Sequence, residues 1–198
     1  MGPMTPRPIN RSWDRLEKWL AAHAPRTFAS LPPAADQGAI DAAQALLGQC
    51  FPAELAESLL RHDGSGYFDV LGAFQLMSTR EIVSTRQFAT RLEEETQREG
   101  RAAHFVLRDG YALWRPNDLP FASNAGGSHW VLDTKPHDAT RRIARHDELG
   151  TTTYPPHVMW ESLSHLLDSV ATALETSTPL ERRLPTTADG RLTWQITT

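Results

Sequence analysis

The spacing of apolar residues changes along this 198-residue chain, and that change restricts the folds open to it. Up to about residue 60 the apolar side chains recur every three or four positions, as is typical of helices. Residues 67–77 instead are aromatic and interrupted by glycine, and after one longer predicted helix that starts at Ser78 the short strand-like runs continue from residue 104. Residues 160–174 return to helical spacing. Strands and helices do not alternate one by one. This order predicts an α+β fold, with a largely antiparallel twisted sheet and surrounding helices.

Local signals predict where several helices begin and end. Ser12 is the predicted cap of a first helix, since a serine side chain can accept a hydrogen bond from a free backbone N–H. Asp36 and Gly48 are predicted to bound a second helix, because aspartate caps helix starts and glycine tolerates the left-handed end. Ser78 followed by Glu81 predicts a capping box at the start of a longer helix.

Turn residues predict the strands. Asp109-Gly110 favours a two-residue hairpin turn, because both residues readily adopt positive φ angles. The predicted strands of this hairpin are residues 104–107 and 111–114, and two further strands are predicted at residues 128–133 and 142–146.

The chain is predicted to contain one main domain. Residues 1–10 are proline-rich and are expected to form a flexible tail, and residues 11–175 are expected to form the domain. Residues 176–198 are expected to be a C-terminal extension with a possible edge strand, where Leu192, Trp194 and Ile196 alternate. Within this extension, residues 176–188 resemble a linker.

Composition excludes several classes of function. The net charge is −4, and the basic residues are scattered, so direct nucleic-acid binding is not expected. No apolar run approaches the ~20 residues of a membrane span, so no membrane association is expected. The single cysteine, Cys50, predicts a reducing compartment and a cytoplasmic location. Its apolar neighbours predict that it is a buried bystander.

No catalytic or metal-binding set stands out. Neither Gly64-Ser65-Gly66 nor Gly127-Ser128 has the spacing of a nucleophile elbow. His157 and His165 are eight residues apart, which is too far for joint zinc ligation on one helix. We therefore expect no enzyme activity, no metal and no cofactor.

Two features are candidates for contacting a protein partner. Glu93, Glu94 and Glu95 form the sharpest charge run, which is either a solvated helix face or an acidic surface that meets a basic partner. Trp194 could anchor a partner, because tryptophan is enriched at binding hot spots, although a core position is favoured.

Three segments together resemble the SUKH superfamily, which includes the fungal glucan-synthesis regulator and many bacterial relatives. Trp13 lies in the first, and the second runs from Phe51-Pro52 to Gly64. The third and strongest segment contains Trp114, Pro120, Phe121, Gly126, Gly127 and Asp133. Two departures concern Ala43 and Gln44, where relatives often have an acidic residue, and the stretch 93–107, which is longer than usual.

The resemblance implies a function that the residues alone do not. Bacterial members of the superfamily typically act as immunity proteins that bind and block toxins, often nucleases or nucleic-acid deaminases. This predicts a non-catalytic protein whose partner is such a toxin domain. Two alternatives are a regulatory scaffold in a cell-wall or signalling pathway, as in fungal members, and a small hydrolase with an unrecognised site.

Overall fold

The computed structural model describes residues 8–66, 69–98, 116–134, 143–146, 152–153 and 160–197. The hairpin predicted around Asp109-Gly110, together with Trp114, lies outside these residues, as does His157.

The described chain is an α+β structure, as predicted, with helices and two antiparallel sheets. The helices are α1 (Ile9–His23), α2 (Pro25–Ala29), α3 (Gln37–Leu47), α4 (Ala53–Arg61), α5 (Thr79–Arg98) and α6 (Leu163–Thr176). The strands are β1 (Gln75–Leu76), β2 (Asp118–Ser123), β3 (His129–Asp133), β4 (Ile143–His146), β5 (Thr152–Thr153), β6 (Arg183–Ala188) and β7 (Arg191–Ile196). Strands β1 to β5 form one sheet in sequence order, and β6 pairs with β7.

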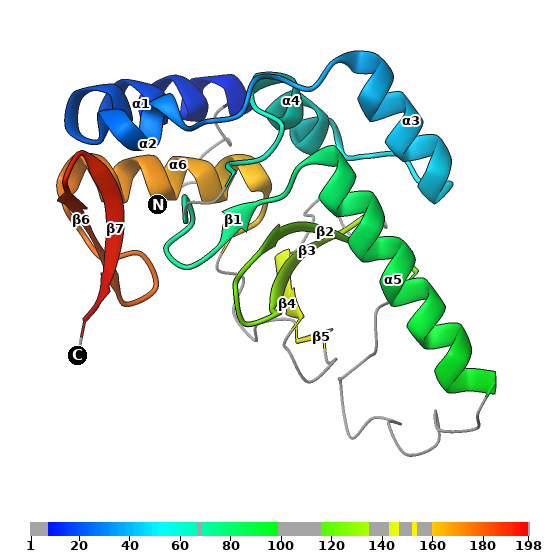
Figure 1. Cartoon of the computed structure of the whole chain (residues 1–198). Coiled ribbons are helices and arrows are strands. Elements are labelled where there is room, and N and C mark those ends of the chain that lie inside the picture. Colours follow the sequence, from blue (N-terminus) through cyan, green and yellow to red (C-terminus); the bar gives the residue numbers. More distant parts are fainter. Residues whose placement is uncertain are drawn as a thin grey trace.

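Figure 1 shows how these elements are arranged. Helices α1 and α6 lie side by side, and the β6–β7 hairpin stands at one end of this pair. Helix α5 crosses the five-stranded sheet beside β2, and α3 lies next to α5. The second half of α5 extends away from the helical layer. One apolar core joins the helices, the sheet and the hairpin.

Two of the predicted helix ends are confirmed in detail. The Asp36 carboxylate accepts a hydrogen bond from the Ala39 N–H at 2.6 Å, and α3 ends at Gly48, whose φ is +59°. At the start of α5, the Ser78 N–H donates to the Glu81 carboxylate at 2.7 Å, and the Glu81 N–H donates to the Ser78 hydroxyl at 3.3 Å. These are the two reciprocal bonds of a capping box.

The predicted cap at Ser12 is wrong, because α1 begins one turn earlier, at Ile9. Ser12 therefore lies inside the helix and is fully buried. Ile9 is also buried and continues the apolar stripe that Trp13, Leu16 and Leu20 form on the core side. Burial of this additional side chain favours the longer helix.

Residues 176–188, which were predicted to resemble a linker, contain strand β6. Asp189 (φ +50°) and Gly190 (φ +72°) form the turn between the paired residues Ala188 and Arg191. Two consecutive positive φ angles define the tight turn that suits a two-residue hairpin. The sequence does not indicate this strand, because half of the residues of β6 are polar and only Pro185 is buried, so β6 lacks an alternating apolar pattern.

The hairpin is held against α2. The Gly190 carbonyl accepts a hydrogen bond from the Arg26 N–H at 2.8 Å, and the Leu192 N–H donates to the Thr27 hydroxyl at 2.9 Å. The Leu192 side chain is buried in the main core. The C-terminal hairpin is therefore packed onto the rest of the fold.

Tryptophans form the centre of the core, where Trp13, Trp130 and Trp160 are all buried. Trp13 is completely buried, and its indole N–H donates to the Ser58 hydroxyl at 3.0 Å, which joins α1 to α4. Trp130 on β3 makes edge-to-face contacts with Trp160 and with Phe74. These contacts connect the sheet to the segment before α6.

Cys50 is exposed, so the prediction of a buried cysteine is wrong. It lies just after the left-handed end of α3 at Gly48, where the chain turns before the buried Phe51. The apolar neighbours that motivated the prediction therefore pack without it.

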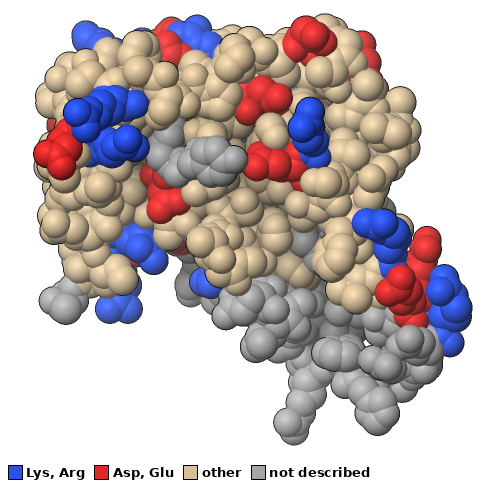
Figure 2. All heavy atoms as spheres, viewed as in Figure 1, with Lys and Arg blue, Asp and Glu red and all other residues tan. Residues whose placement is uncertain are grey.

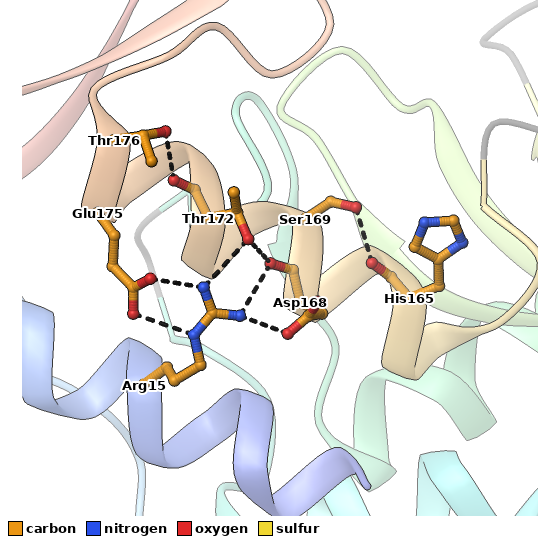
Figure 3. A network of polar contacts seen from close by, with 7 residues as sticks. All are labelled: Arg15, His165, Asp168, Ser169, Thr172, Glu175 and Thr176. Carbon is orange, nitrogen blue, oxygen red and sulfur yellow. Dashed lines mark hydrogen bonds and ion pairs between the residues drawn. The ribbon is translucent and has the colours of Figure 1, made fainter. Parts of the chain in front are cut away.

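Ion pairs join α1 to the helices beside it. Figure 3 shows that Arg15 extends from α1 to α6 and lies between Asp168 and Glu175. Its guanidinium lies 2.5 Å from a Glu175 oxygen and 3.1 Å from the Thr172 hydroxyl. Arg15 and Asp168 are each less than one-fifth exposed, which limits screening by solvent.

A second ion pair, between Glu17 and Arg61, predicts a pH dependence of stability. Hydrogen bonds from Arg61, and a smaller contribution from His62, lower the pKa of Glu17 from its ordinary value of 4.5. A lowered pKa means that ionised Glu17 stabilises the fold above pH 4.5 and that this contribution is lost as the pH falls further.

We expect Glu17→Gln to lower the free energy of unfolding by about 1 kcal/mol at pH 7, because Arg61 is partly exposed and the pair is screened. The difference from the unmodified chain should shrink below pH 4.5 in urea titrations. Exposed Glu57→Gln on α4 is the control. A difference that stays constant from neutral to acidic pH would contradict the assigned ion pair.

Candidate partner-binding surface

Several residues of the recognised motifs lie in turns and core positions. Gly64 has φ +83°, and a Cβ there would come within 2.7 Å of the Leu76 carbonyl oxygen and the Ser78 nitrogen. The neighbouring Asp63 carboxylate accepts a hydrogen bond from the Thr79 N–H at 2.7 Å. This turn therefore sets the position at which α5 begins. Pro52 directly precedes α4.

The strongest motif forms the β2–β3 hairpin. Phe121 is fully buried at the irregularity of β2 that follows Pro120, and its carbonyl accepts a hydrogen bond from the Met77 N–H at 2.9 Å. In the connecting turn Gly127 has φ +83°, whereas Gly126 donates its N–H to the Asn124 side chain. Asp133 lies at the end of β3, paired with Asp118 of β2.

The acidic run divides between two environments. Glu93 is only partly exposed and lies close enough to the buried Arg86 to interact with its charge. Burial lowers the pKa of Arg86, and the carboxylates of Asp118 and Glu93 oppose that shift. Glu94 and Glu95 are exposed. Figure 2 shows acidic and basic side chains side by side at the projecting end of α5.

Trp194 is half-buried and packs against the main core. Its indole N–H donates to the Asp69 carbonyl at 2.8 Å, which ties β7 to the segment before β1. Trp194 therefore lies at the margin of the core and is not one of its buried residues. A role of Trp194 in partner binding stays a prediction.

A groove between α3 and α5 is a candidate that the sequence did not indicate. Its first section has a volume of about 390 Å³ and lies between the start of α5 and the exposed side of α3. The lining residues of this section are Ala39, Ala42, Ala43, Leu46, Thr79, Arg80, Val83, Ser84 and Gln87. A second section of about 410 Å³ continues from Leu46 and Gln87, and it adds Leu47, Gln49, Arg86, Thr90, Arg91 and Pro116. We call the two sections together the α3–α5 groove.

The α3–α5 groove combines an apolar surface with positive charge. Leu46 is 65% exposed at the point where the two sections meet. Three arginines line the groove, and no aspartate or glutamate is among its lining residues, although the whole chain carries a net charge of −4. Arg80 and Arg91 are exposed. Arg86 is buried and donates a hydrogen bond to the Pro116 carbonyl at 3.1 Å.

One signal for the groove was present in the sequence. Ala39, Ala42 and Leu46 form a second apolar stripe on α3, beside the core stripe of Ile40 and Ala43. A helix with apolar residues on more than its core-facing side indicates a second contact surface. The other wall of the groove could not be predicted from the sequence. It is formed by α5, which lies far from α3 along the chain and whose position depends on the turn at Gly64.

The described residues contain no group of three or more histidines, cysteines, aspartates or glutamates that could hold a metal ion. His129 and His146 are cross-strand neighbours on β3 and β4, with ring centres 6.4 Å apart, a pairing that sequence spacing did not indicate. Burial lowers the pKa of His129. Within the described part of the chain, no helix has the length and hydrophobicity needed to cross a membrane.

These features define an α+β domain whose candidate site is a groove between two helices on its surface. The profile of the SMI1/KNR4 family (SUKH-1) matches residues 34–169, which is more than half of the chain. The chain belongs to this family, and the resemblance inferred from its motifs is confirmed. The matched segment includes both walls of the groove. Among curated proteins, no sequence matches the chain.

Proposed function

We propose that this protein is a non-catalytic immunity protein, which binds a cognate toxin domain directly and blocks its activity in the cytoplasm. Membership of the SMI1/KNR4 family (SUKH-1) supports a role in binding and regulation. The α3–α5 groove is the observation on which the choice of binding surface rests, because it exposes the large apolar side chain of Leu46 beside a second helix. The toxin is a protein, with a nuclease or nucleic-acid deaminase domain as the expected class.

The walls of the groove suit direct protein binding. Asp36 caps α3, and the box of Ser78 and Glu81 caps α5, so the first turn of each wall is held by local hydrogen bonds before a partner arrives. A pre-organised surface loses less conformational entropy on binding than a mobile one. Exposed Leu46 is positioned to be covered by the partner, since burial of apolar surface drives association.

The charge of α5 would orient the partner. Arg80 and Arg91 are exposed on the groove side, whereas Glu94 and Glu95 are exposed further along the same helix. Charges of opposite sign on one surface favour a partner in one orientation and disfavour the reversed one. We therefore place Glu94 and Glu95 at the edge of the proposed interface. Glu93 would instead stabilise the positive charge of Arg86.

Co-expression with a toxin encoded beside this gene tests the function. Cells that produce the toxin with this protein should survive, and cells that produce the toxin alone should die. The purified pair should form a complex in which the toxin has lost activity. If the protein rescues no neighbouring toxin and instead binds kinases or cell-wall enzymes, the immunity proposal is wrong and the scaffold alternative replaces it.

A further inference from the structure

We propose that the α3–α5 groove binds an acidic amphipathic helix of the partner. This inference deepens the proposed function and rests on it for the identity of the partner. The walls of the groove indicate that the bound segment is helical, and the charges of the lining residues indicate that it is acidic.

The walls of the groove favour a helix over an extended segment. Both walls are helices, whose interior N–H and C=O groups are already paired, so they offer no strand edge to an extended peptide. Recognition must therefore use side chains. Ala39, Ala42 and Ser84 are small, which lets another helix approach closely, and Leu46 projects between the two sections. Side-chain spacing of three and four residues on both walls matches the way in which helices pack together.

The positions of the arginines set the length of the occupant. Arg80 and Arg91 are eleven residues apart on α5, which corresponds to roughly 16 Å along the helix axis. A helix of about three turns lying along the groove spans this distance. α3 has eleven residues and provides a wall of similar length.

The charges of the lining residues select an acidic occupant. Arg80 and Arg91 are exposed at the two ends of the groove, and no lining residue carries a negative charge that would attract a basic helix. Beyond Thr90, the next exposed carboxylate on α5 is that of Glu94, one helical turn further along. Carboxylates that flank the apolar side of the incoming helix would therefore meet arginines at both ends.

Two model peptides test the proposal on the intact protein. Each is a 14-residue, end-blocked, fluorescent helix with leucines on one side; one has glutamates flanking the leucines, and the other has lysines at the same positions. We expect the glutamate peptide to bind at least ten-fold more tightly in fluorescence anisotropy, with an affinity that falls as salt is added. Equal affinities, tighter binding of the lysine peptide, or no binding of either would overturn the proposal.

Variants locate the binding site. Leu46→Asp should weaken binding of the glutamate peptide at least ten-fold, and Leu60→Asp, on the exposed side of α4, should leave it unchanged. The double variant Arg80→Glu/Arg91→Glu should reverse the preference and bind the lysine peptide more tightly. Because 65% of Leu46 is exposed, its change leaves the core intact, which circular dichroism can verify.

The peptide result is independent of toxin rescue. Peptide binding without rescue would leave the groove assignment standing and contradict the immunity role. Rescue without peptide binding would support the immunity role and overturn the acidic-helix assignment.

Discussion

Gly64→Ala should lower the free energy of unfolding by about 2–3 kcal/mol, because two costs combine at this position. The residue has φ +83°, which is unfavourable for a side chain, and a Cβ would lie 2.7 Å from the backbone atoms of Leu76 and Ser78. Neither backbone atom can move freely, since this segment leads from β1 into α5. Chemical denaturation followed by circular dichroism measures the loss.

Gly48→Ala is the matched control. Gly48 also has a positive φ, +59°, but no atom lies within 4 Å of the position where its Cβ would be. Its substitution should therefore cost only the backbone strain, about 1 kcal/mol. Equal losses at the two glycines would contradict the steric role assigned to the turn at Gly64.

Trp13→Ala should have the largest effect on stability, a loss of about 3–5 kcal/mol. The side chain is completely buried at the centre of the core, so its removal leaves a cavity among α1 and its neighbours. It also leaves the Ser58 hydroxyl without the indole donor that lies 3.0 Å away. Urea titration of the purified variant measures the loss.

Two further variants separate packing from the hydrogen bond. Ser58→Ala removes only the hydroxyl and should cost about 1 kcal/mol. Trp194→Ala removes a half-buried tryptophan and should cost less than Trp13→Ala. If Trp13→Ala and Trp194→Ala were equally destabilising, the placement of Trp13 at the core centre would be wrong.

Features that depend on neighbouring residues could be predicted from sequence. The cap at Asp36, the left-handed end at Gly48 and the capping box of Ser78 and Glu81 each involve residues within one helical turn. The order of elements likewise predicted the α+β class. Ser12 shows the limit of such signals, because a buried Ile9 extended α1 past a residue that could have capped it.

Features that depend on distant segments could not be predicted in this way. The α3–α5 groove requires knowledge of where α5 lies, and the turn at Gly64 sets that position through contacts with residues 76–78. The sequence presents Glu93, Glu94 and Glu95 as one acidic run, whereas the helix places Glu93 near Arg86 and leaves Glu94 and Glu95 exposed. In the β6–β7 hairpin, alternation indicates β7, whereas β6 is defined by its pairing with β7 and not by apolar burial.

Binding of the neighbouring toxin by Leu46→Asp, compared with Leu60→Asp, measures most directly whether the partner occupies the α3–α5 groove. Both variants place a carboxylate at an exposed leucine, but only Leu46 lines the groove. In calorimetric titrations Leu46→Asp should lose at least ten-fold in affinity, and Leu60→Asp should bind as the unmodified protein does. Full affinity in Leu46→Asp, or an equal loss in both variants, would contradict binding at this surface.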